Sequence, residues 1–110
     1  MPMKYILQGK NIKITPTIEG FIDGKVKSLE RFTSRFNQDS LELRIEVGKP
    51  SRHHRSGLIF YAELNLKLPG QLLRAEANHL DLNFAINESF GEIEGQVKKF
   101  KEKLIAKKRN

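Results

Sequence analysis

Three consecutive segments in the middle of the chain alternate apolar and polar residues with a period of two. They span residues 41–47, 58–68 and 71–78, and Pro69-Gly70 separates the last two. This period is typical of β-strands with one buried face, and Pro-Gly is typical of a turn. Because the alternate positions are polar or charged, we expect a sheet with one face in solvent, as antiparallel sheets permit.

Two helical patterns flank these strands. Thr15-Pro16 supplies an N-cap hydroxyl and a proline at the first helical position, and we expect the first helix to run to about Arg35. The second should begin near Asp81 as its N-cap. The apolar residues recur every three or four positions, at Ile18, Phe21, Ile22, Val26, Leu29, Phe32 and Phe36, and at Leu82, Ala85, Ile86, Phe90, Ile93, Val97, Phe100 and Leu104.

With a further strand over 5–10, the predicted order is β-α-β-β-β-α. This order indicates an α+β two-layer sandwich, a four-stranded sheet with both helices on one face. A second helix of about 25 residues is roughly 38 Å long, whereas an eight-residue strand covers about 27 Å. The end of the second helix should therefore project beyond the sheet.

Length and composition narrow the class of protein. A chain of 110 residues with 38% hydrophobic content fits one domain, 1–110, with one core. The absence of cysteine excludes disulfides and thiol chemistry, and no apolar run approaches the ~20 residues of a membrane span. We therefore expect a cytoplasmic protein without a membrane partner.

The charge of the chain is concentrated at its end. Residues 96–110 hold seven Lys or Arg against the single Glu102, so 7 − 1 = +6 of the formal net charge of +7 lies there. The helix dipole favours a few cations at a helix C-terminus, but a charge this dense also attracts a polyanion. A helix merely kept soluble by lysines remains the alternative.

Further cations lie on the first helix and in the loop 48–57. On a helical projection Lys27, Arg31 and Arg35 share one flank with Gly20 and Gly24, Glu19, Asp23 and Glu30 share another, and Lys25 lies at the edge of the core stripe. The loop adds Lys49, Arg52 and Arg55, and arginine suits phosphate binding. The adjacent His53 and His54 have no nearby carboxylate or thiol, so we expect polar loop residues and no metal site.

Two pairs of glycines, Gly20/Gly24 and Gly91/Gly95, interrupt the two helices at a spacing of four residues. Each glycine costs about 1 kcal/mol relative to alanine in a helix interior. There are two explanations. Either the pairs arise by chance, or they flatten a helix face so that the other helix or a nucleic-acid backbone can approach closely.

Catalysis has little support in the sequence. Glu42, Glu46, Glu63 and Glu76 fall on the predicted outer face of the sheet among basic residues, a pattern typical of cross-strand pairs. Hydrolase, Walker and dinucleotide motifs are absent. We expect no enzyme activity, no cofactor and no small-molecule substrate.

In order along the chain, several segments resemble one family, the ribosome hibernation-promoting factors and ribosome-associated translation inhibitors. The resemblance covers nearly the whole chain and is carried by 12–18, 29–32, 66–70, 73–77, 81–88 and 94–101. It implies a fold close to the double-stranded-RNA-binding domain with an extra first strand. Because the sequence ends at Asn110, we expect a monomer without the C-terminal dimerisation domain of long members.

The resemblance further implies binding to rRNA of the small ribosomal subunit, in the mRNA and tRNA channel near the decoding site. Such a protein blocks translation sterically and stabilises idle ribosomes. The contact residues carried over by position are Lys25, Lys27, Arg31, Lys98, Lys99, Lys101 and Lys103. To these we add Arg35 from the basic flank of the first helix and Lys49, Arg52 and Arg55 from the loop.

The chain departs from the family pattern at two positions. Gly95 replaces a frequent Arg or Lys, and the aromatic residue at the start of the second helix is Phe84, where the family often has Tyr at the position of Asn83. Two other functions stay open, a general structured-RNA-binding module and a protein-interaction domain with incidental charge.

Overall fold

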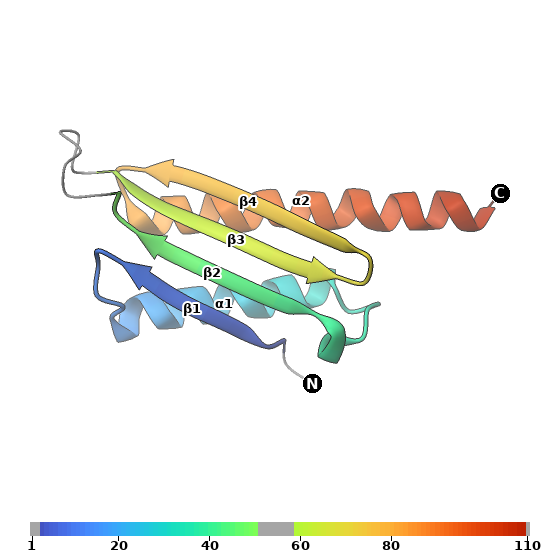
Figure 1. Ribbon diagram of the computed structural model, residues 1–110, viewed down its shortest axis with the longest axis horizontal. Coiled ribbons are helices and arrows are strands. Elements are labelled where there is room, and N and C mark those ends of the chain that lie inside the picture. Colours follow the sequence, from blue (N-terminus) through green and yellow to red (C-terminus); the bar gives the residue numbers. More distant parts are fainter. Residues whose placement is uncertain (1–2, 51–58, 110) are drawn as a thin grey trace.

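The computed structural model describes residues 3–50 and 59–109. It has the predicted β-α-β-β-β-α order, with one short 3₁₀ helix, η1, inserted before the second strand (Figure 1). The elements are β1 Tyr5–Lys10, α1 Pro16–Phe32, η1 Gln38–Ser40, β2 Glu42–Gly48, β3 Phe60–Leu68, β4 Gln71–His79 and α2 Leu82–Arg109. Residues 51–58 lie outside the described part of the chain. They include most of the predicted basic loop, with Arg52, His53, His54 and Arg55.

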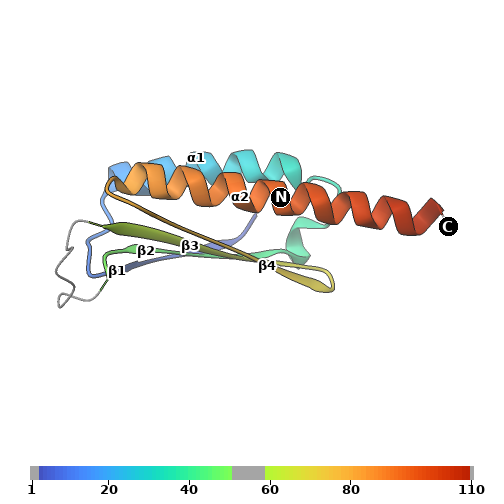
Figure 2. The same cartoon turned by 90° about the horizontal axis from the view of Figure 1, so that it is seen from above.

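The four strands follow one another in the order β1-β2-β3-β4. The β2–β3 and β3–β4 pairs are antiparallel, but β1 pairs with β2 in parallel, so the sheet is mixed and not purely antiparallel. A parallel pair requires a long crossover connection, and α1 is that connection. The sheet still has one face in solvent, as predicted, because both helices cover the other face (Figure 2).

The core lies between this sheet and the helix layer. Leu43, Leu64 and Leu66 of the sheet are fully buried, and so are Ile22 of α1 and Phe90 of α2. The remaining residues of the two predicted apolar stripes pack in or against this cluster as far as Phe100. Each large aliphatic or aromatic side chain contributes about 1.5–3 kcal/mol on burial, which makes the two-layer contact the main stabilising term.

The first helix ends three residues earlier than predicted, at Phe32. The Thr33 side chain is buried, and its hydroxyl donates to the Leu29 carbonyl at 3.1 Å. Lys101 of α2 donates from Nζ to the Phe32 carbonyl at 2.8 Å. Because these donors satisfy the last carbonyls of the helix, the chain turns away and leaves Arg35 in the connection to β2.

The second helix extends well past the sheet, as predicted (Figure 1). It starts after Asp81, whose Oδ1 accepts the backbone N–H of Asn83 at 2.8 Å, and its 28 residues stretch the molecule to 53 × 26 × 19 Å. In the described residues, neither helix has a stretch apolar enough to cross a membrane.

We expect Lys101 to act mainly in the fold. Replacing Lys101 with Gln removes the charged donor to the Phe32 carbonyl, and a hydrogen bond to a charged group contributes about 1.5–3 kcal/mol. Because this contact is partly exposed, the lower end of the range applies to the loss of unfolding free energy in urea titrations. Lys98→Gln is the matched control and should leave stability unchanged; equal effects of the two variants would contradict this assignment.

The glycines of α1 and α2 do not allow the two helices to approach closely, so this explanation of the glycine pairs is wrong. A Cβ built at Gly20, Gly24, Gly91 or Gly95 meets no atom within 4 Å.

Gly24→Ala and Gly95→Ala should therefore each raise the unfolding free energy by about 1 kcal/mol through helix propensity. Gly48→Ala should lower the unfolding free energy, because its Cβ would clash with the Lys10 carbonyl oxygen. An unchanged or lower urea midpoint for Gly24→Ala would contradict the open geometry.

Candidate nucleic-acid interface

The predicted sorting of charge on α1 is visible in its contacts. The acidic flank faces β1, where Asp23 Oδ1 accepts from the Tyr5 hydroxyl at 3.3 Å and Glu30 Oε1 accepts the Met3 backbone N–H at 2.9 Å. Burial, followed by the charge of Asp23, raises the pKa of Tyr5. The acids of α1 therefore hold β1, and the basic flank is left facing outward.

Lys27 and Arg31 supply the exposed charge of this flank. Lys27 Nζ lies 3.3 Å from Asp23 Oδ2, and the two side chains are 71% and 46% exposed. Such an exposed pair contributes little, so a phosphate can compete for Lys27. Arg31 and Arg35 are exposed and form no ion pair among the described residues.

Lys25 lies between the helices, at the edge predicted for it. Its ammonium donates to Asn87 Oδ1 of α2 and lies 5.4 Å from the centre of the Phe21 ring. Burial raises the pKa of the neighbouring Glu94, and the charge of Lys25 opposes that rise. Lys25 thus joins the two helices, which makes it a weaker candidate for contact with a partner than Lys27.

The cations of α2 point in three directions. Lys101 reaches α1, as described above. Lys98 is exposed on the outer side of the helix layer, and Lys99 and Lys103 line a groove beside β4. Lys98, Lys99 and Lys103 form no ion pair with any described residue, so their charges are available to a ligand.

Lys49 lies at the opposite end of the molecule from this cluster. It follows β2, and its ammonium is 5.2 Å from the centre of the Phe60 ring. Lys49 does not join the cations near the end of α2 in one patch, because β2 ends at the opposite end of the sheet from the C-terminus of α2 (Figure 1).

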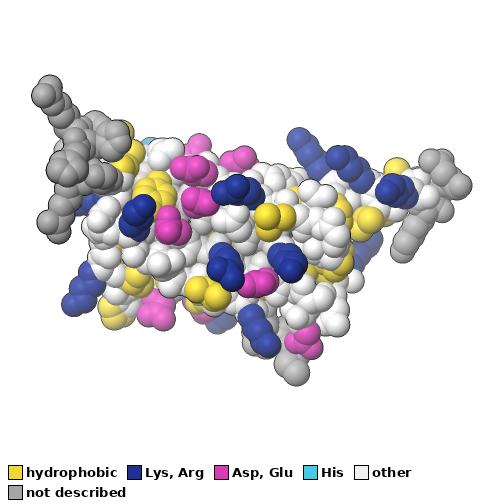
Figure 3. All heavy atoms as spheres, viewed as in Figure 1, with side chains coloured by type: hydrophobic (Ala, Val, Ile, Leu, Met, Phe, Trp, Pro, Cys, Tyr) yellow, Lys and Arg dark blue, Asp and Glu magenta, His cyan; other side chains and the backbone are white. Residues whose placement is uncertain are grey.

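The open face of the sheet carries charges of both signs in equal number, with Lys10, Arg44, Lys67 and Arg74 beside Glu42, Glu46, Glu63 and Glu76. Glu46, Glu63 and Glu76 are direct neighbours across three strands, and acidic side chains gather over this part of the sheet (Figure 3). Arg74 reaches Glu63 at 3.2 Å, which confirms one predicted cross-strand pair. Burial and a 2.8 Å hydrogen bond to Glu46 raise the pKa of Tyr61, and Glu63 and Glu76 add to the rise. This face therefore has no net charge to attract a polyanion.

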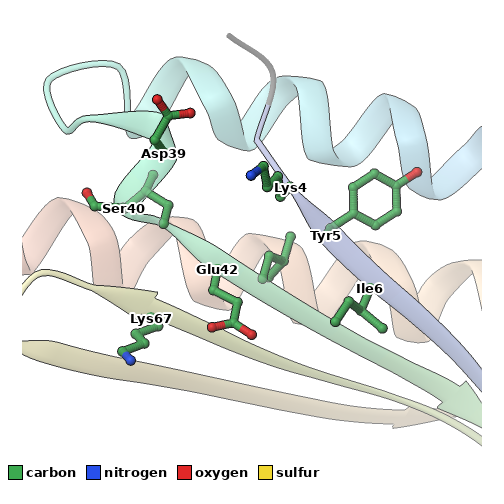
Figure 4. Close-up of a pocket in the computed structure, with 9 residues that line it drawn as sticks. Lys4, Tyr5, Ile6, Asp39, Ser40, Glu42 and Lys67 are labelled. Carbon is green, nitrogen blue, oxygen red and sulfur yellow. The ribbon is translucent and has the colours of Figure 1, made fainter.

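A hollow near the start of β1 and β2 has balanced charge. Figure 4 shows Lys4 and Lys67 there with Asp39 and Glu42. The Tyr5 side chain points away from this open side, towards α1. Two cations and two anions give no net attraction for phosphate. In the described part of the chain, no three His, Asp or Glu side chains are placed to hold a metal ion.

Sequence reasoning missed two surface features. The groove beside β4 is formed by β4 and by the part of α2 that continues past the sheet. Apolar periodicity alone does not predict which residues of β4 and α2 face each other there. Phe84 is 59% exposed and lies against His79, with 4.9 Å between ring centres. The displaced aromatic residue at the start of α2 therefore lies outside the core, and its helical phase relative to Ala85 and Ile86 could have indicated this.

Similarity to known proteins extends over most of the chain. The hibernation promoting factor of Klebsiella oxytoca is 29% identical over 102 residues, which cover 93% of this chain and 97% of that protein. The ribosome hibernation promotion factor of Deinococcus radiodurans is 28% identical over 102 residues, 92% of this chain. The match covers only 50% of the Deinococcus protein, so the chain spans about half the length of some relatives.

Solved structures agree with the fold. The N-terminal domain of Thermus thermophilus Protein Y superposes with a TM-score of 0.69 at 30% identity, covering 91% of this chain and 99% of that one. A ribosomal subunit interface protein from Coxiella burnetii shares the fold, with a TM-score of 0.67 at 20% identity. The family model described as sigma 54 modulation protein / S30EA ribosomal protein matches residues 5–105. The chain therefore belongs to this family, the predicted family of ribosome hibernation factors.

Proposed function

We propose that this protein binds rRNA of the small ribosomal subunit through its helix layer, near the decoding site, in the channel that mRNA and tRNA occupy. Occupying this channel excludes both RNAs, so translation is inhibited sterically and idle ribosomes are stabilised. The partner is a ribosome, and the mechanism requires neither a cofactor nor a chemical step.

The observation that carries this proposal is a set of exposed cations in the helix layer that form no ion pair. Arg31 of α1 and Lys98, Lys99 and Lys103 of α2 pair with no acid among the described residues, whereas acids such as Glu46 and Glu76 balance the cations of the open sheet. A polyanion is therefore attracted more strongly to the helix layer than to the sheet. Family membership supports ribosomal RNA as this polyanion.

The length of the molecule also supports binding in a channel. At 53 × 26 × 19 Å it is a narrow rod with cations towards the end of its longest helix. A double-stranded-RNA-binding domain instead places its lysines at the start of its second long helix to grip across a groove. Here the lysines of α2 begin only at Lys98, so a general duplex-binding module is the second candidate.

Sedimentation with purified particles tests both candidates. The protein should pellet with small subunits and with whole ribosomes at low salt, and binding should decline as salt rises because counterions are released on contact. Free duplex RNA of matched phosphate concentration should compete poorly. Equal binding to any duplex would favour the general module, and no pelleting at low salt would contradict both.

A pair of double variants separates the helix layer from the sheet face. Lys98→Gln with Lys103→Gln should weaken binding to small subunits and lower the slope of log K against log salt by about two, one per lost phosphate contact. Lys4→Gln with Lys67→Gln makes the same charge change on the sheet side and should change neither. Equal losses in the two double variants would contradict binding through the helix layer.

The helix glycines bear on the same surface. The open space above Gly24 and Gly95 permits a nucleic-acid backbone to approach α1 and α2 more closely than a side chain allows. Gly95→Ala should therefore lose ribosome affinity while it gains stability. Unchanged affinity in the stabilised variant would remove the close-approach hypothesis and leave the proposed function intact.

A further inference from the structure

A groove of about 350 Å³ lies between the start of β4 and the last turns of α2. It forms where α2 continues past the β3–β4 hairpin (Figure 2). Leu73, Phe100 and Leu104 are its apolar lining, and it also includes Lys99, Lys103 and Lys107. Among the described residues no carboxylate lines it, which distinguishes it from the balanced hollow beside β1.

The inner end of the groove is fixed by a direct contact between its walls. Gln96 donates from Nε2 to the Arg74 carbonyl of β4 at 2.7 Å. Phe100 is held from the other side, because its ring stacks on Phe36 with 6.0 Å between centres. The groove is therefore a preformed feature at the end of the core.

The lysines of the groove are regularly spaced. Lys99, Lys103 and Lys107 follow one another at intervals of four residues, which corresponds to about 6 Å along a helix. A regular row of cations beside one wall suits a ligand with a regular row of anions along one strand. It does not suit a duplex gripped on two strands across a groove.

The apolar lining calls for a second chemical group in the ligand. Leu104 is 38% exposed there and Phe100 is half-buried, so the groove offers apolar surface beside its charges. Phosphate binding alone gains nothing from that surface. An unpaired nucleotide supplies both groups, since its base is free to leave the stack and enter an apolar site next to its own phosphates.

We propose that this groove binds an unpaired segment of ribosomal RNA, with a base against Phe100 and Leu104 and the flanking phosphates on Lys99, Lys103 and Lys107. The inference takes rRNA as the partner from the proposed function and adds the strandedness of the RNA and the place of its base. An acidic polypeptide could also pair with the lysines, and the experiment below distinguishes it.

The test compares two neighbouring apolar residues of α2. Leu104 lines the groove and is 38% exposed, whereas Ile105 is 40% exposed and does not line it. Leu104→Gln should weaken binding of a fluorescein-labelled single-stranded RNA octamer about five-fold in anisotropy titrations. The variant removes apolar surface beside Phe100, and stacking of one base on an aromatic side chain contributes at least about five-fold. The salt dependence of binding should not change, because no charge is lost. Ile105→Gln should bind like the parent protein.

Two further probes complete the experiment. A hairpin RNA with the same number of phosphates should bind parent and Leu104→Gln within two-fold of each other, and salt-washed small subunits free of mRNA should show the same loss as the octamer. Circular dichroism and urea midpoints verify that both variants are folded.

Several results would overturn the inference. These are an octamer affinity of Leu104→Gln within two-fold of the parent, an equal loss on the hairpin, full retention of subunit binding, or polyglutamate binding with the same dependence on Leu104. If the parent protein fails to pellet with small subunits, the proposed function fails, whereas failure of the octamer comparison alone removes only the groove.

Discussion

The register of the four strands determines which residues of this protein face the helices and which face solvent. One row of inward side chains runs across the whole sheet from Tyr5 through Leu43 and Leu66 to Leu73. A one-residue slip of any strand would exchange its buried and exposed faces. Because only the inward row can be covered by apolar helix stripes, both helices are confined to one layer, and their cations are confined with them.

The same register creates a row of acidic residues on the open face. Gln8, Glu46, Glu63 and Glu76 form an outward row across the four strands. Like charges opposite one another destabilise a sheet, and Arg74 offsets part of this cost through its contact with Glu63. The position of this acidic row thus follows from strand pairing, and Lys10, Arg44 and Lys67 on the same face offset its charge.

Periodicity was sufficient to predict the elements and the layers. The alternation in 41–47 and the stripe from Ile22 to Leu29 fix which faces are buried, and this depends only on local sequence. The parallel pairing of β1 and the end of α1 at Phe32 were not predictable in this way. The first depends on strand order, and the second depends on Lys101, a contact made 69 residues away along the chain.

The candidate site shows a similar division. The basic flank with Lys27 and Arg31 and the exposed Lys98 could be located from helical phase alone. The roles of Lys25 and Lys101 could not, because an ammonium that joins two helices looks in sequence like one that faces solvent. Leu104 gained its candidate role only from the groove, which forms between elements that are distant in the chain.

The central claim is that the helix layer faces ribosomal RNA and the open sheet faces away from it. The chain has no cysteine, so an iron chelate can be attached at a single introduced thiol, Glu102→Cys on α2 or Glu76→Cys on the open sheet. Directed hydroxyl-radical probing of small subunits then reports which face is near rRNA. We expect strong rRNA cleavage from position 102 and weak cleavage from position 76. Stronger cleavage from position 76 would contradict the account.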